Sequence, residues 1–141
     1  HKESPPIEIG KGIVIKEGSR VAILGIGNIL AVAQDVASSL DRAGVSTTLV
    51  SLHTVKPLDT KLLDSLWTGH ERLCTIEEHG LSGGAGSAIL EWANNHPVDS
   101  SKLSRFGVKD SFLTGCGSQA EAREMLGLDC EAIFDEIMRS L

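Results

Sequence analysis

One stretch, residues 73–91, constrains the fold of this chain more than any other part of the sequence. Residues 73–76 form a short apolar run with β-branched members, which is typical of a buried strand. The polar residues 77–79 follow, and three glycines then fall within residues 80–84, where a helix or strand interior would disfavour them. From Ala85 onward the apolar residues recur at helical spacing. In an open parallel sheet such a turn lies at the carboxyl ends of the strands, where these folds place ligands and partners.

Strands and helices alternate along the rest of the chain. Residues 20–25 and 45–52 are predicted as further strands, and residues 103–108 as a weaker one. Between and after these runs, apolar residues recur at helical spacing. This alternation predicts an α/β domain of three layers, with helices on both faces of a mostly parallel sheet.

Several side chains are expected to fix the ends of these helices or to fill the core. Asn28, Asp59 and Asp129 are predicted N-caps, and Ser118 with Glu121 matches a capping box. The glycines at 83, 84 and 86 are expected to serve backbone geometry and close helix approach. The expected core includes Leu24, Val50 and Ile76, and the last helix is expected to bury Ile133, Phe134, Ile137 and Leu141.

The N-terminal part, residues 1–17, is predicted to be a linker followed by a small edge ribbon at residues 7–16. Residues 18–141 are predicted to form the domain itself. His1 stands where a methionine would begin a natural chain, which suggests a tag remnant and a piece excised from a longer protein.

Charge and cysteine content exclude several classes of protein. The formal net charge of -6 disfavours a phosphate-backbone partner, so nucleic acid is not expected. The 3 cysteines are widely spaced, which suits a reducing cytosol better than a disulfide framework. No apolar run approaches the roughly 18 residues that span a bilayer. We expect a cytoplasmic protein without a membrane partner.

Three glycine motifs resemble known sites but depart from them. The residues 25–28 suggest a dinucleotide fingerprint, yet Leu30 stands where its third glycine belongs. The residues 80–84 match a nucleophile elbow around Ser82, yet the acid and histidine that should follow are not suitably placed. A phosphate loop would also need a lysine after the glycines. None of these motifs predicts a site.

The adjacent carboxylates Glu77 and Glu78 are of more interest. Neighbouring residues on a strand face opposite ways, so one carboxylate is expected to bind local amides while the other faces a partner. Cys116, between two glycines before a helix, is either a thiol of lowered pKa or a passive turn residue. His53, His70 and His96 are dispersed and carry no signal.

Taken in order, these segments resemble the C-terminal domain of the transketolase family of thiamine-diphosphate enzymes. The resemblance covers residues 18–141 and is most specific at Thr75-Ile-Glu-Glu-His-Gly-Leu-Ser-Gly-Gly-Ala-Gly-Ser. Gly18-Ser-Arg-Val-Ala-Ile-Leu-Gly-Ile-Gly, Val55-Lys-Pro-Leu-Asp and Gly127-Leu-Asp-Cys-Glu-Ala-Ile support it. Relatives that share this domain include 1-deoxyxylulose-5-phosphate synthase and the β-chains of 2-oxoacid dehydrogenases. The residues 77–79 with their glycines are closer to split or transketolase-like members.

The resemblance implies a five-stranded mixed sheet and a full enzyme that moves two-carbon ketol units between sugar phosphates, as in the pentose phosphate pathway. It implies that thiamine diphosphate and magnesium bind to a separate domain with a Gly-Asp-Gly motif, which this chain lacks. The glutamate that acts on the cofactor ring belongs to a middle domain. No catalytic, cofactor-binding or metal-binding residue can therefore be carried over to this chain.

Two classes of function follow. The first is an assembly domain that contacts the remaining transketolase domains or subunit, in a full enzyme expected to be a homodimer. The second is a module that binds a small anion or nucleotide at the carboxyl edge of the sheet. In the first class, the residues expected to contact another domain or subunit are Glu77, Glu78, His79, Gly80, Ser82, Gly83 and Gly84.

Overall fold

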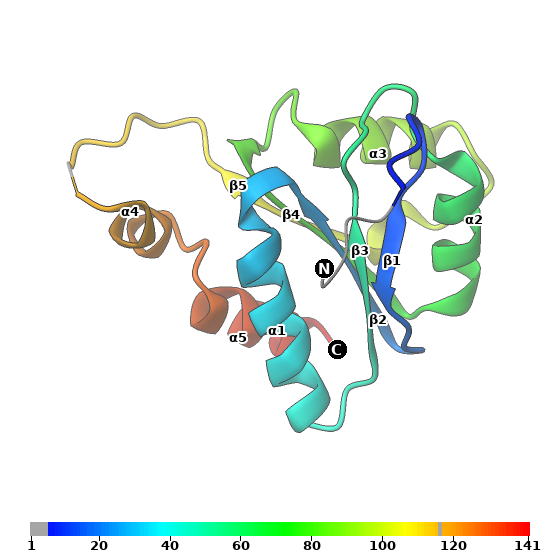
Figure 1. Cartoon of the computed structure of the whole chain (residues 1–141), viewed down its shortest axis with the longest axis horizontal. Coiled ribbons are helices and arrows are strands. Elements are labelled where there is room, and N and C mark those ends of the chain that lie inside the picture. The colour runs from blue at the N-terminus through cyan, green and yellow to red at the C-terminus, as the bar shows by residue number, and fades with distance from the viewer. Residues whose placement is uncertain (1–5, 116) are drawn as a thin grey trace.

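The computed structural model describes residues 6–115 and 117–141 and shows a five-stranded mixed sheet (Figure 1). The strand order is β1-β3-β2-β4-β5, with β1 antiparallel to β3 and the other pairs parallel. The strands are Ile13–Lys16 (β1), Val21–Ile26 (β2), Thr47–Ser51 (β3), Arg72–Gly80 (β4) and Leu103–Val108 (β5). The helices are Leu30–Arg42 (α1), Thr60–Gly69 (α2), Ala85–Asn94 (α3), Gln119–Met125 (α4) and Cys130–Ser140 (α5). The predicted three-layer α/β fold is confirmed.

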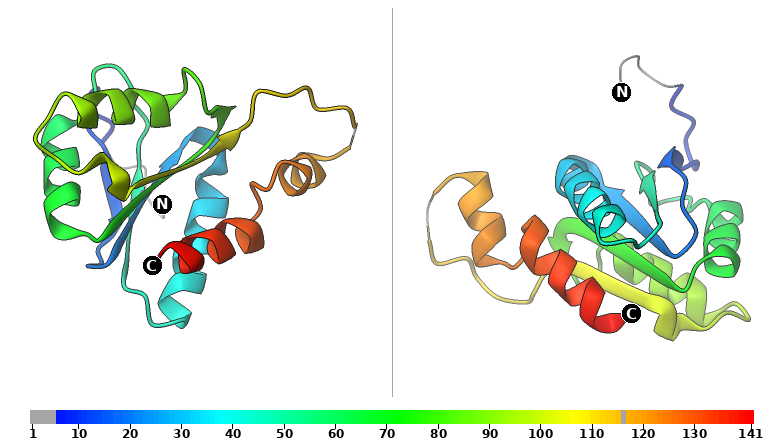
Figure 2. Two further views of the ribbon diagram at one scale, coloured as in Figure 1. Left: turned by 180° about the vertical axis from the view of Figure 1, so that it is seen from behind. Right: turned by 90° about the horizontal axis from the view of Figure 1, so that it is seen from below.

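Two apolar cores lie on the two faces of the sheet. One contains residues of α1 and α5, and the other contains residues of α2 and α3. Figure 2 shows the same layers from behind and from below. The central strand β2 is buried along its whole length, because helices cover both of its faces. Leu24, Val50 and Ile76 are each fully buried, as predicted.

Most of the predicted helix starts are confirmed. The Asp59 carboxylate accepts the Leu62 N–H at 3.2 Å, and Asp129 accepts the Ala132 N–H at 3.0 Å. The Ser118 and Glu121 capping box is present at the start of α4. The Asn28 cap was wrong, because residues Gly27–Ile29 form a 3-10 turn and Ile29 occupies the N-cap of α1.

Three other boundaries differ from expectation. The edge ribbon predicted at residues 7–16 is present only as the edge strand β1, Ile13–Lys16, which pairs with β3, so the sheet begins before residue 18. Strand β4 runs four residues past Ile76, to Gly80, where it pairs with Val108 after a shift in register. Leu141 is exposed, because α5 ends at Ser140. In the part of the chain that the structure describes, no helix has the length and apolar character needed to cross a membrane.

Candidate functional site

The stretch singled out in the sequence forms the end of β4, a turn, and the start of α3. Alternation along β4 places Thr75 and Glu77 under α3, while Cys74 and Ile76 face the core beneath α1 and α5. Glu77 is fully buried. Its two carboxylate oxygens accept the Ala85 N–H and the Gly86 N–H, each at 2.7 Å. A buried carboxylate thus satisfies the first amides of α3 and complements the positive end of the helix.

Two glycines allow α3 to approach that carboxylate. A Cβ atom at Gly84 would lie 2.5 Å from Glu77 Oε2 and 2.6 Å from the Gly80 carbonyl oxygen. A Cβ atom at Gly86 would lie 2.7 Å from Thr75 Oγ1. Gly83 has a φ of 79°, in the left-handed region that favours glycine. The predicted structural role of these glycines is confirmed.

Glu78 points to the opposite side of the strand from Glu77, as strand alternation predicts. Its Oε1 atom accepts the Arg123 Nε–H at 2.8 Å and the Gln119 Nε2–H at 3.0 Å, both from α4. The two adjacent carboxylates therefore hold two different helices, Glu77 holding α3 and Glu78 holding α4.

The remaining residues of the predicted contact lie at the surface. His79, Gly80, Ser82 and Gly83 are exposed, whereas Gly84 is half-buried. The buried Glu77 carboxylate cannot be a surface contact, so its inclusion was wrong: both oxygens are engaged inside the domain. A contact role for the exposed members stays a prediction.

One residue that holds this turn was missed at the level of the sequence. The Arg105 Nη1–H of β5 donates to the Leu81 carbonyl at 2.9 Å and to Ser87 Oγ at 3.3 Å. In the sequence, Arg105 stands out only as a charged residue at the third position of a weakly predicted core strand. Its partners are set by the pairing of β4 with β5, which is not visible in local sequence.

The residues of this chain do not fit thiamine diphosphate with its metal. Among the described residues, no group of three or more His, Cys, Asp or Glu side chains is placed to hold a metal ion. A metal-bound diphosphate needs hard oxygen ligands that converge, and here the two adjacent carboxylates diverge to different helices. No step through that cofactor is derived for this chain.

The reactive side chains also take other roles. Burial raises the pKa of the Cys74 thiol to about 12, which removes it as a nucleophile near neutral pH. Cys116, the other candidate thiol, lies outside the described residues. His70 bridges Thr48 Oγ1 at 2.8 Å and the Leu66 carbonyl at 3.0 Å, and His96 stacks on Trp92.

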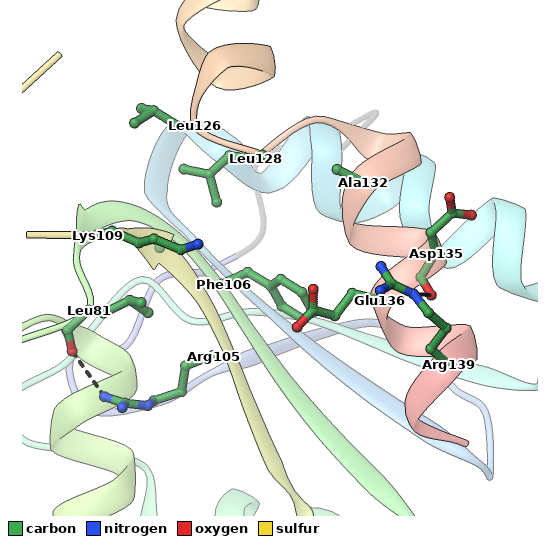
Figure 3. Close-up of a pocket in the computed structure, with 12 residues that line it drawn as sticks. Leu81, Arg105, Phe106, Lys109, Leu126, Leu128, Ala132, Asp135, Glu136 and Arg139 are labelled. Atoms are coloured by element: carbon green, nitrogen blue, oxygen red, sulfur yellow. Dashed lines mark hydrogen bonds between the residues drawn. The ribbon is translucent and has the colours of Figure 1, made fainter. Parts of the chain in front are cut away.

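A cavity of about 280 Å³ lies between the end of β5 and α5 (Figure 3). Lys109 and Arg139 line it together with Asp135 and Glu136, so the charges of these four side chains offset each other. Arg105 also lines the cavity but donates to Leu81, as the dashed line in Figure 3 shows. The alternative of a small-anion module gains no support from this cavity.

Comparisons with known proteins agree with this geometry. The family model described as "Transketolase, C-terminal domain" matches residues 10–133. The 1-deoxy-D-xylulose-5-phosphate synthase of Chlorobaculum tepidum is 34% identical over 98% of this chain and 21% of its own length. The enzyme of that name from Pseudoalteromonas translucida is 40% identical over 93% of this chain and 20% of its own. The chain thus spans about a fifth of these relatives, at 21% and 20% of their lengths.

Solved structures give a similar picture. A structure described as "Split gene transketolase, inactive beta4 tetramer" has a TM-score of 0.83 and 30% identity. The match covers 94% of this chain and 43% of that one. A transketolase from Pichia stipitis has a TM-score of 0.64 at 15% identity over 92% of this chain and 18% of its own, a likeness of fold alone.

Proposed function

This chain belongs to the transketolase C-terminal domain family, and on that premise we propose that it is the assembly domain of a thiamine-diphosphate-dependent transferase of two-carbon units. The proposal rests on the hydrogen bonds that the two adjacent carboxylates, Glu77 and Glu78, accept within this domain. Glu77 binds the amides of α3 and Glu78 binds side chains of α4, so the acidic groups at the sheet edge organise this domain and leave no converging metal ligands.

The full enzyme, in this proposal, holds the cofactor and magnesium on domains outside this chain. The chain spans 21% and 20% of the first two relatives, which leaves room for those domains in the same polypeptide or in a partner subunit. Its exposed edge at His79 and Ser82 contacts them, and the enzyme is a cytoplasmic homodimer. The activity is transfer of ketol units between sugar phosphates, as in the pentose phosphate pathway.

A second candidate is synthesis of 1-deoxy-D-xylulose 5-phosphate. It is favoured by relatives of that name at 34%, 40% and 41% identity, the last from Glaesserella parasuis. The split-gene transketolase structure, at 30% identity, supports the first candidate. The two reactions differ in the unit transferred, because a 1-deoxy product lacks the hydroxyl oxygen that a ketol unit carries.

One assay separates the candidates. The complete enzyme, with thiamine diphosphate and magnesium, is given an aldose phosphate acceptor and either a ketose phosphate or a 2-oxoacid as donor. Mass spectrometry then reads whether the product is a ketose phosphate or its 1-deoxy counterpart, lighter by one oxygen. The first proposal requires the fully oxygenated product from the ketose donor. Formation of the 1-deoxy product alone contradicts it and establishes the second candidate.

A further inference from the structure

The loop after β5 and the helix α4 stand away from the body of the domain in all three ribbon views (Figures 1 and 2). The structure describes every residue of α4, and none of them is buried. Apolar side chains gather on this projection. Phe112 is 97% exposed, Met125 is 61% exposed and Leu113 is 46% exposed.

Leu113 and Met125 line one hollow of about 200 Å³, together with Ala122 and the charged Glu121 of α4. Met125 lies over Gly115: a Cβ atom built on Gly115 would lie 2.9 Å from the Cε atom of Met125. The hollow has the size of one large apolar side chain, and Phe112 is the neighbour of Leu113 in the chain. An exposed aromatic anchor beside a mainly apolar hollow is typical of the centre of a protein interface.

The helix α4 is held in place although none of its residues is buried. Its capping box fixes the first turn of α4, with the Ser118 N–H donating to Glu121 Oε2 at 2.7 Å. Glu78 of β4 binds Arg123 and Gln119, which ties α4 to the candidate contact edge. Met125 is therefore presented on a helix that is already held in place, so the ordering that binding requires of it is reduced.

We propose that Phe112, Leu113 and Met125, here called the α4 surface, dock against the part of the same enzyme that lies outside this chain. The inference rests on the proposed function, since it assigns the surface by which the assembly domain binds the cofactor-bearing part. That part contributes an apolar side chain to the hollow and an apolar seat for Phe112.

The length of chain outside the structure supports this occupant over a second copy of the domain. The chain spans 21% and 20% of its first two relatives, so roughly four-fifths of such an enzyme is available to cover the surface. Two copies of this domain would also bring together two molecules of net charge -6, which disfavours a self-contact.

The test uses the complete enzyme, with the photo-reactive amino acid p-benzoylphenylalanine in place of Phe112. After illumination, mass spectrometry identifies the crosslinked peptide. The proposal requires crosslinks to peptides from outside this domain. The same probe in place of Met138, an exposed apolar residue of α5, is the control and should give at least tenfold fewer such crosslinks.

A second variant tests the same surface without the bulky photo-reactive side chain. The pair Leu113→Ser and Met125→Ser should raise deuterium uptake in peptides of the residue 109–126 region of the complete enzyme, whereas Met138→Ser should leave it unchanged. Crosslinks only to a second copy of this domain, or no crosslinks at all, overturn the proposal. These readouts do not depend on turnover, so they separate a wrong docking surface from a wrong activity.

Discussion

The local arrangement of β4 and α3 depends on the buried carboxylate of Glu77. It is fully buried, and its two oxygens take the first amides of α3 at 2.7 Å each. Hydrogen bonds to a charged acceptor are stronger than neutral ones, and a buried donor that loses its acceptor is costly.

Glu77→Gln should therefore destabilise the domain by about 2–3 kcal/mol, because the amide keeps one acceptor and turns an N–H group toward an N–H group. Chemical denaturation measures the change in the free energy of unfolding. Glu91→Gln, on the exposed face of α3, is the matched control and should change it by less than about 0.5 kcal/mol. Equal stability of both variants would show that the Glu77 carboxylate does not anchor α3.

The glycine at 84 gives a second test at the scale of one residue. Gly84→Ala should cost about 1–3 kcal/mol, because its Cβ atom would meet Glu77 Oε2 at 2.5 Å and a backbone oxygen at 2.6 Å. Gly69→Ala is the control: it lies at the end of α2, and a Cβ atom there meets nothing within 4 Å among the described residues. Thermal melts of the two variants that coincide would refute the close-approach argument.

The buried thiol of Cys74 should make the free energy of unfolding of the domain depend on pH. Desolvation raises its pKa from 9.0 to about 12 in the folded state, so the unfolded state loses its proton first. The stabilisation is fully present below pH 9 and falls by about 1.4 kcal/mol per pH unit as the pH rises toward 12. Cys74→Val should remove this part of the slope in urea unfolding between pH 9 and 11. An unchanged slope would mean that the thiol ionises in the folded domain.

At the scale of the element, β4 shows why its end could not be predicted. The apolar run 73–76 predicts a strand, and the polar residues after it predict a loop. Glu77, however, remains buried in the strand because α3 supplies its two donors, and Gly80 pairs with Val108 of a strand that follows 23 residues after β4. Both partners are distant in sequence. The starts of α2 and α4 were predictable because each N-cap residue and the amide that it binds lie within the same few residues.

An ion pair between Arg123 of α4 and Glu78 of β4, beside the hydrogen bond from Gln119 to the same carboxylate, ties α4 to the sheet. Arg123→Gln should release it, so hydrogen exchange in α4 should speed up by about fivefold, which corresponds to a loss of ~1 kcal/mol. Global stability should change by less than this amount, because none of the described residues of α4 is buried. Glu124→Gln, on the next residue, is the control and should leave the exchange unchanged. Unaltered exchange in both variants would contradict the tie to Glu78.

At the scale of the whole molecule, the fold was predictable and the site only in part. Alternating strands and helices with buried β-branched runs give a three-layer domain, and that was confirmed by the sheet and its two cores. The divergence of Glu77 and Glu78 followed from strand alternation. The helices that they reach, and the exposure of Phe112 on the α4 surface, depend on the three-dimensional packing of segments far apart in the chain.

In the proposed role, this chain organises an enzyme whose cofactor is bound by other domains. Isothermal titration of the 141-residue chain with thiamine diphosphate and magnesium tests whether the chain binds the cofactor by itself. We expect no heat of binding at micromolar to millimolar ligand, because the carboxylates at the sheet edge are engaged with α3 and α4. Saturable binding with a micromolar dissociation constant would show that this chain itself holds the cofactor.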